Sequence, residues 1–206
     1  MSHAADGVAV HLVDDEAPVR AALEFLLSSH GISVHSYDGG PALLARLDQG
    51  LALRGCMLLD VRMEPMSGLQ VHDEMVARGI QLPVIFLTGH GDIRMAVAAL
   101  KKGAFDFVEK PFGDAVLVDR VRDAMAADAV QQARLADGDA RGARIAGLTP
   151  REQDVMQRVA AGKLNKVIAD EMHVSMRTVE VHRARVFAKL GVRSAAELAT
   201  LLATAT

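Results

Sequence analysis

The chain has 206 residues, 50% of them hydrophobic, and a formal net charge of −3, which allows one large domain or two small ones with ordinary apolar cores. Its one cysteine, Cys56, excludes an intramolecular disulfide and fits a reducing compartment. No apolar run approaches the roughly 18 residues that a membrane span needs, and residues 1–7 lack a signal-peptide pattern. We therefore expect a cytoplasmic protein with no membrane partner.

Strands and helices are expected to alternate through the first domain, residues 1–125. Apolar runs bounded by Gly, Pro and Asp predict strands at 8–13, 32–37, 56–59, 84–87 and 106–109. The segments between them predict helices at 18–30, 41–47, 68–77 and 94–102, and a last helix from near 114 with room to continue past 130. Alternation of this kind predicts an α/β fold, a doubly wound five-stranded parallel sheet of the flavodoxin-like type.

Residues 126–147 are expected to link this domain to a second one. They contain Ala, Arg, Asp and Gly without a sustained apolar period, so we expect a linker that is only partly helical. Charge divides the chain at the end of this segment: residues 1–147 carry 14 Lys and Arg against 20 Asp and Glu, whereas the remainder carries 9 against 6. An acidic part and a basic part favour different partners.

Residues 148–206 carry only helical signals and predict a small all-α domain of four helices. The N-terminal caps are expected at Thr149, Asn165, Ser175 and Ser194, with capping boxes formed by Thr149 and Glu152 and by Ser194 and Glu197. The expected helix ends are Gly162 for the first helix, Gly191 for the third and about Leu202 for the last.

Polar side chains follow four of the predicted strands, namely Asp14 with Asp15, Asp60, Thr88 and Lys110. Taken singly, each has an ordinary structural explanation, such as a helix cap, a loop start or a surface ion pair. Because the carboxyl ends of parallel strands converge on one crevice, we expect these residues to be neighbours. Carboxylates about 4 Å apart repel by roughly 1 to 4 kcal/mol, so their clustering favours a hard divalent cation such as Mg²⁺.

A carboxylate beside Mg²⁺ can attack phosphorus and form an aspartyl phosphate. In that chemistry the metal and Lys110 neutralise the phosphoryl oxygens, and the hydroxyl of Thr88 donates a hydrogen bond to one of them. The sequence has neither a Walker loop nor a dinucleotide-binding fingerprint. The phosphoryl donor is therefore expected to be another molecule.

The segments 13–16, 59–63, 88–91 and 107–112 contain these residues and resemble the receiver domain of bacterial two-component response regulators. The resemblance covers about the first 125 residues and implies that Asp60 is the phosphoacceptor. It further implies that Thr88 and Lys110 contact the phosphate, and that Phe107 is a switch aromatic whose rotamer follows the threonine.

The same resemblance implies a set of ligands for Mg²⁺ or another divalent cation: Asp14, Asp15, Asp60 and the backbone carbonyl of Arg62. The chain departs from the family at Glu64, where such proteins usually have a proline, which is here displaced to Pro65. The loop to Gly68 keeps its length, so we expect the site to survive. Glu64 adds a charge near the ion and is expected to affect the phosphorylation rate or the metal affinity.

Residues 163–190 predict a helix, a tight turn and a longer helix. The inward stripe of the longer helix consists of Val179, His182, Val186 and Leu190, with Phe187 at its flank. The outward stripe consists of Arg177, Glu180, Val181, Ala184 and Arg185. Such a stripe suits a DNA major groove, where Arg reads guanine, Glu reads cytosine and small apolar groups meet thymine methyls. Periodicity alone favours a plain solvated face on a small bundle.

The segments 148–152, 165–169 and 177–183 resemble the LuxR-type DNA-binding domain. This resemblance implies base contacts by Glu180, Val181, Ala184 and Arg185, and phosphate contacts by Lys166, Arg177, Thr178 and Arg183. With the receiver-like part in front, the whole chain resembles the FixJ/NarL class of transcriptional regulators.

The combined resemblance implies a phosphorylation-dependent transcription regulator. The implied partners are a sensor histidine kinase, double-stranded promoter DNA and a second copy of the chain when phosphorylated, with RNA polymerase as a further candidate. The expected dimerisation face contains residues 94–102 and 106–109. No enzyme activity is implied beyond self-phosphorylation and slow autodephosphorylation at Asp60.

Two other functions stay open. A phosphohydrolase of the haloacid-dehalogenase type also uses a strand-end Asp with Mg²⁺, but it needs a second Asp two residues later, where this chain has Arg62. In a phosphate-independent DNA-binding or scaffold protein, the receiver-like part would serve only for dimerisation.

Overall fold

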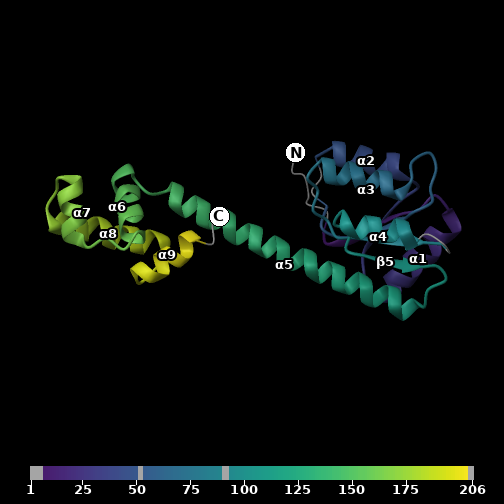
Figure 1. The fold of residues 1–206 in the computed structure, drawn as a ribbon. Helices are drawn as coiled ribbons and strands as arrows, with labels where there is room; N and C mark the ends of the chain where they lie inside the picture. The colour runs from purple at the N-terminus through teal and green to yellow at the C-terminus, as the bar shows by residue number, and fades with distance from the viewer. Residues whose placement is uncertain (1–6, 51–52, 90–92, 204–206) are drawn as a thin grey trace. The chain divides into compact units, whose positions relative to one another are not determined.

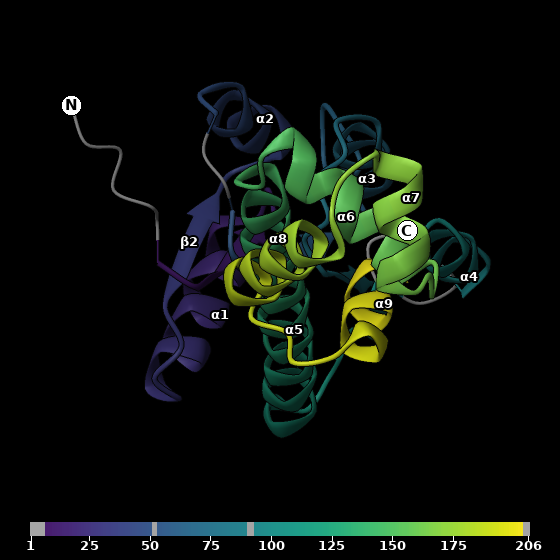
Figure 2. The same cartoon turned by 90° about the vertical axis from the view of Figure 1, so that its left-hand side faces the viewer.

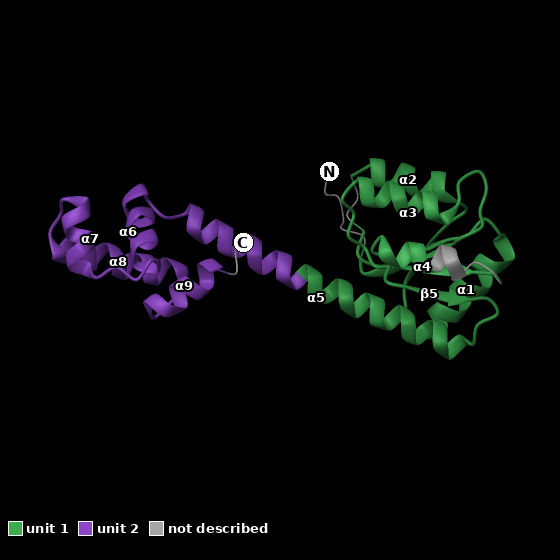
Figure 3. Ribbon diagram, viewed as in Figure 1, with its two compact units in different colours: residues 1–132 green, residues 133–206 purple. Residues whose placement is uncertain are grey.

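The computed structural model describes residues 7–50, 53–89 and 93–203. The chain divides into two compact units, Met1–Gln132 and Ala133–Thr206, which we call unit 1 and unit 2 (Figures 1 and 3). The boundary between them falls inside one long helix.

Unit 1 is built on a single parallel sheet. Its strands are β1 (Ala9–Val13), β2 (Val34–Tyr37), β3 (Gly55–Asp60), β4 (Val84–Thr88) and β5 (Asp106–Glu109), in the spatial order β2-β1-β3-β4-β5. The connecting helices are α1 (Ala17–Ser29), α2 (Gly40–Asp48), α3 (Gly68–Ala77) and α4 (Ile93–Lys101), and α5 (Asp114–Ala146) follows β5. All four strand pairs are parallel, which confirms the predicted doubly wound sheet.

The two faces of the sheet form separate apolar cores, because successive residues of a strand point to opposite faces. One face carries Val10, Leu12, Leu58 and Ile85 under α1 and α5, which contribute Leu23, Leu27, Leu117 and Val121. The other face carries Val13, Met57, Leu59 and Phe86 under α2, α3 and α4, which contribute Leu43, Val71, Met75 and Ala99. Because these cores bury both faces of the sheet, polar functional groups lie at the ends of the strands.

Helix α5 is longer than the sequence indicates. It has 33 residues and runs without interruption through the segment expected to be a partly helical linker. That segment contains no proline and has Ala at positions 133, 136, 140, 143 and 146. Since Ala has the highest helix propensity, the helix continues although its apolar period has ended.

Unit 2 contains the four expected short helices, α6 (Pro150–Ala160), α7 (Asn165–Met172), α8 (Met176–Leu190) and α9 (Ala195–Ala203). Figures 1 and 2 show them gathered together, and their shared core includes Val155, Ile168, Val179, Val186 and Leu198. The capping box of Thr149 with Glu152 is confirmed, and Ser175 caps α8 as expected. Gly191 ends α8 with a left-handed φ of 71°, a backbone conformation that glycine adopts without strain.

One expected cap and one half of an expected capping box differ in the structure. The prediction that Asn165 caps α7 is wrong, because Leu164 is the extended cap residue and Asn165 is already helical, with its Oδ1 accepting a hydrogen bond from Arg183. Ser194 accepts from the N–H of Glu197 as a cap would, but the carboxylate of Glu197 accepts from the N–H of Arg193.

Among the helices that the structure describes, none combines the length and the apolar character needed to cross a membrane.

Candidate functional site

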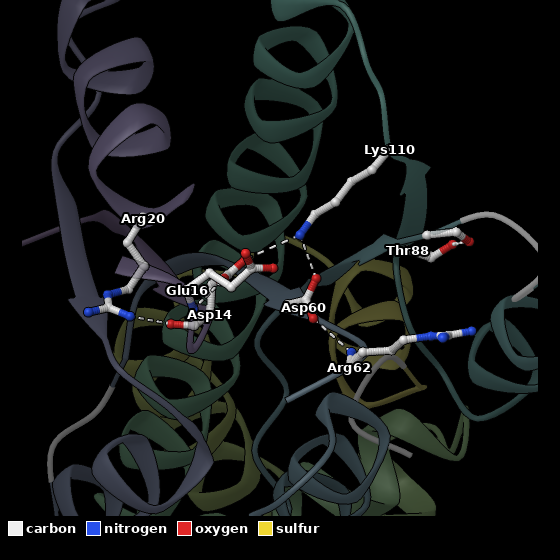
Figure 4. Close-up of polar contacts among 8 residues, drawn as sticks. Asp14, Glu16, Arg20, Asp60, Arg62, Thr88 and Lys110 are labelled. Atoms are coloured by element: carbon white, nitrogen blue, oxygen red, sulfur yellow. Dashed lines mark hydrogen bonds and ion pairs between the residues drawn. The ribbon is translucent and has the colours of Figure 1, made fainter. Parts of the chain in front are cut away.

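The polar residues predicted at strand ends lie at one edge of the sheet of unit 1 (Figure 4). Asp14 directly follows β1, Asp60 and Thr88 are the last residues of β3 and β4, and Lys110 directly follows β5. The strand register brings these ends together, since Asp60 pairs with Leu87 and Thr88 pairs with Glu109.

Lys110 joins two buried acids. Its Nζ lies 2.6 Å from Oδ1 of Asp60 and 3.3 Å from Oδ2 of Asp14. Asp14 is 0% exposed and Asp60 is 7% exposed, so neither carboxylate is well solvated. The amino group points towards both of them in Figure 4, and the second oxygen of Asp60 accepts from the N–H of Arg62 at 2.7 Å.

Burial and charge act in opposite directions on this group. Burial raises the pKa of the Asp60 carboxyl group, and the hydrogen bond and charge of Lys110 offset only part of the rise. For Lys110, burial alone would lower the pKa, but its bonds to Asp60 and Asp14 outweigh burial, and the pKa is raised. Two carboxyl groups facing one ammonium group leave surplus negative charge when both are ionised, and a bound cation would offset it.

The loop that carries Asp14 is fixed by several hydrogen bonds. The N–H of Glu16 donates to Oδ1 of Asp14 at 2.8 Å. The guanidinium of Arg20, on α1, donates to the backbone carbonyl of Asp14 at 2.7 Å. The sequence analysis did not predict a role for Arg20. Side chains of a helix tilt towards its N-terminus, so an arginine one turn into the helix can reach back to the acidic loop before it. That spacing was the signal in the sequence.

The structure does not bring every predicted residue to the same point. Asp15 is exposed, and its Oδ2 accepts from the N–H of Glu64 at 3.3 Å. Thr88 is buried, and its hydroxyl donates to the carbonyl of Gly89 at 3.2 Å. Figure 4 shows the guanidinium of Arg62 pointing away from Asp60. Phe107 is half-buried on β5 and packs against the core under α2, α3 and α4.

Two of the predicted metal ligands, Asp14 and Asp60, are placed so that they could bind a hard cation. The carboxylates of Asp14 and Asp60 reach the same ammonium group, so their oxygens lie close enough to share an ion of opposite charge. Carboxylate oxygens are ligands that Mg²⁺ prefers. Among the residues that the structure describes, no three His, Cys, Asp or Glu side chains are grouped to hold a metal, and Asp15 bonds to the N–H of Glu64.

The predicted DNA-binding stripe of unit 2 lies on the solvent side of α8. Arg177, Glu180, Val181, Ala184 and Arg185 are all exposed, and Lys166 on α7 is exposed as well. Val179, Val186 and Leu190 are buried on the opposite side, with His182 and Phe187 half-buried beside them. Helix α8 therefore presents a polar face with two arginines and a small apolar strip.

Two of the predicted phosphate contacts also hold unit 2 together. Arg183 donates to Oδ1 of Asn165 at 2.9 Å, and its guanidinium lies 5.1 Å from the ring centre of Phe187. Thr178 lies 2.8 Å, oxygen to oxygen, from the capping hydroxyl of Ser175. The bond from Arg183 to Asn165 joins α8 to α7, and the contact of Thr178 with Ser175 lies at the start of α8.

Two family models match the chain. Residues 10–122 match the response regulator receiver domain, and residues 146–202 match the bacterial regulatory proteins of the luxR family. The first match covers unit 1 into the first third of α5, and the second covers the end of α5 and the helices of unit 2.

Relatives with known roles cover nearly the whole chain. The C4-dicarboxylate transport transcriptional regulatory protein DctR of Rhodobacter capsulatus is 50% identical, over 93% of this chain and 98% of its own length. The transcriptional regulatory protein FixJ of Azorhizobium caulinodans is 44% identical, over 94% of this chain and 90% of its own length.

Solved structures give the same result. The response regulator StyR has a TM-score of 0.85 and 36% identity, over 95% of this chain and 98% of its own. Full-length FixJ from B. japonicum has a TM-score of 0.60 and 39% identity, over 97% of both chains. The chain belongs to the FixJ and DctR type of response regulators, transcriptional regulators of two-component systems in which a receiver domain precedes a LuxR-family DNA-binding domain.

Proposed function

We propose that Asp60 is the phosphoacceptor of this regulator and that its phosphorylation controls DNA binding by unit 2. The observation that supports this most strongly is the amino group of Lys110 held between the carboxylates of Asp60 and Asp14 at the open edge of the sheet. We assign residues 1–125 to the receiver domain, 126–147 to the linker and 148–206 to the DNA-binding domain.

In the proposed reaction a carboxylate oxygen of Asp60 attacks phosphorus. The new P–O bond forms as the bond from phosphorus to the donor breaks, which is a P–N bond for the phosphohistidine of a sensor kinase and a P–O bond for acetyl phosphate. The leaving group departs with the bonding electrons: the histidine nitrogen then takes a proton from solvent, and acetate leaves as its carboxylate. Lys110 exchanges its bond to Asp60 for one to a phosphoryl oxygen, which neutralises charge there.

Receiver domains generally bind Mg²⁺ at the acidic phosphorylation site, and here Asp14, Asp60, the carbonyl of Arg62 and a reoriented Asp15 would hold such a divalent ion. When bound, it supplies positive charge for the phosphoryl oxygens. Oδ2 of Asp15 accepts from the N–H of Glu64, so a reorientation of this carboxylate towards the ion would act on the loop that contains Glu64.

The switch is proposed to begin at Thr88. Its hydroxyl would leave the carbonyl of Gly89 and donate to the phosphoryl group, and Phe107 would move with it. The neighbouring surface at residues 94–102 and 106–109 would then form a homodimer. Val97 and Leu100 on α4 are 44% and 37% exposed, which gives this surface the apolar side chains that a dimer interface needs.

The exposed side of α8 is proposed to enter the major groove. Glu180, Val181, Ala184 and Arg185 would contact bases, and Lys166, Arg177, Thr178 and Arg183 would contact phosphates. In a dimer the two units would occupy half-sites about one helical turn apart, roughly 34 Å. Because bacterial promoter DNA lies in the cytoplasm, we propose that the regulator acts there, with RNA polymerase as a candidate partner. The only chemistry proposed for the chain is phosphorylation and slow dephosphorylation of Asp60.

The proposal is tested by incubating the protein with acetyl phosphate and Mg²⁺ and following covalent phosphate by mass spectrometry. We expect one phosphoryl group per chain, and none in Asp60→Asn. Asp119→Asn is a matched control, because Asp119 is an exposed acid on α5, and it should label like the unsubstituted protein. Undiminished labelling of Asp60→Asn would place the nucleophile elsewhere.

A further inference from the structure

Arg20 holds the loop of Asp14 at two points. Its backbone N–H donates to the carbonyl of Glu16 at 3.0 Å, which starts α1. Its guanidinium turns back along the helix and donates to the carbonyl of Asp14 at 2.7 Å, as Figure 4 shows. The side chain is half-buried, so water competes weakly for this hydrogen bond.

Each polar atom of Asp14 is consequently engaged. Its N–H donates to the carbonyl of Tyr37 at 3.3 Å, its carbonyl accepts from Arg20, and its Oδ1 accepts from the N–H of Glu16. The remaining oxygen, Oδ2, faces Lys110. Three of these bonds hold the backbone and one oxygen, and they leave Oδ2 for Lys110, which also bonds to Asp60.

We propose that Arg20 is a positioning residue for the reaction at Asp60: it fixes the backbone of Asp14 so that Oδ2 points into the site where the divalent cation binds. This role rests on the proposed function of Asp60. Arg20 touches neither the phosphoryl group nor the ion, and it acts through the carbonyl of Asp14.

Charge and positioning predict opposite results for the loss of Arg20. A guanidinium beside the loop of Asp14 repels a cation bound there, so removing the charge alone would make Mg²⁺ bind more tightly. If the hydrogen bond positions Asp14, removing it frees the loop, and Mg²⁺ binds more weakly. Residues that orient a metal ligand typically change affinity by about 10- to 100-fold when substituted.

The test is a Mg²⁺ titration of the full-length protein, followed by NMR shifts of the backbone amides of Glu16 and Arg62, which donate to Asp14 and Asp60. We expect Arg20→Met, which keeps the apolar stem, to weaken Mg²⁺ binding by about tenfold. Arg20→Lys, which keeps the charge, should recover part of the loss. Arg122→Met is the matched control, because Arg122 is exposed on α5, and it should bind like the unsubstituted protein.

Phosphorylation by acetyl phosphate gives a second readout. With Arg20→Met, saturating Mg²⁺ should restore most of the rate, whereas a damaged nucleophile would stay slow at every Mg²⁺ concentration. Equal or tighter Mg²⁺ binding by Arg20→Met overturns the positioning role. If that variant fails to fold in a urea titration, Arg20→Ala, which also lacks the donor, decides, and equal or tighter Mg²⁺ binding there overturns the role as well. If the unsubstituted protein shows no Mg²⁺ shifts at these amides, the proposed function falls, and the role of Arg20 with it.

Discussion

At the carboxyl edge of the sheet, one lysine compensates two buried acids. Lys110 bonds to Asp60 and Asp14, which are 7% and 0% exposed, and burial keeps the pKa of Asp60 raised despite the lysine. A buried charge that loses its partner is costly, so both acids stay ionised at low cost only while a cation lies near them. Lys110 provides that cation here, and a divalent ion would share the task.

Replacing Lys110 should separate catalysis from metal binding. In Lys110→Met the competing ammonium is gone, so we expect Mg²⁺ to bind at least as tightly as in the unsubstituted protein. The charge that stabilises the transferred phosphoryl group is also gone, so labelling by acetyl phosphate should slow by about 100-fold or more. Calorimetric Mg²⁺ titration and a labelling time course check the two effects. Arg122→Met, at an exposed basic residue on α5, is the control, and an unchanged labelling rate in Lys110→Met would contradict the assignment.

Glu152 is a second residue whose charge is fixed by its surroundings. The hydrogen bond from Lys189 at 2.7 Å, together with that from the N–H of Thr149, lowers the pKa of Glu152 to about 2. Because the folded pKa is below the ordinary value of 4.5, its stabilisation is present above that value and is lost as pH falls towards 2.

Amide hydrogen exchange in α6 and α8 of the full chain, measured between pH 5 and pH 2.5, tests this linkage. We expect protection of both helices to fall over this range. In Glu152→Gln protection should be lower at pH 5 and should depend less on pH. The same pH dependence in Glu152→Gln as in the unsubstituted protein would assign the effect to other acids.

Among the elements, strands and capped helices were predictable because their signals are local. The strand alternation placed Asp14, Asp60, Thr88 and Lys110 at one edge, and the capping box of Thr149 was read directly. The second half of α5 was not predictable from periodicity, since its helix depends on Ala content instead. The outward turn of Asp15 was not predictable either, because it depends on a hydrogen bond to Glu64, 49 residues away in sequence.

Substitutions on α7 and α8 should distinguish residues that give affinity for DNA from residues that give sequence specificity. In Lys166→Ala we expect binding to weaken uniformly across DNA sequences. The slope of log affinity against log salt concentration should become shallower by about one unit, which is the loss of one phosphate contact. In Arg185→Ala we expect a loss of about 1 to 3 kcal/mol on the specific site and little change on random DNA. Fluorescence anisotropy at several salt concentrations checks both. Equal losses on specific and random DNA for Arg185→Ala would make Arg185 a phosphate contact.

In the whole molecule, phosphorylation in unit 1 is proposed to control DNA binding by unit 2. Phosphate can control DNA binding only if it favours one arrangement of the protein over another. The exposed apolar side chains of α4 offer one route, because a dimer would bring two DNA-binding units to adjacent half-sites. A receiver that serves only for dimerisation would instead give DNA binding that ignores phosphate.

DNase footprinting of the promoter that this regulator controls, with and without acetyl phosphate at fixed salt, tests this coupling most directly. We expect protection to appear at lower protein concentration with acetyl phosphate, over two half-sites about one helical turn apart, and we expect Asp60→Asn to show no such gain. Identical footprints with and without acetyl phosphate, on a protein shown by mass spectrometry to be phosphorylated at Asp60, would contradict the account.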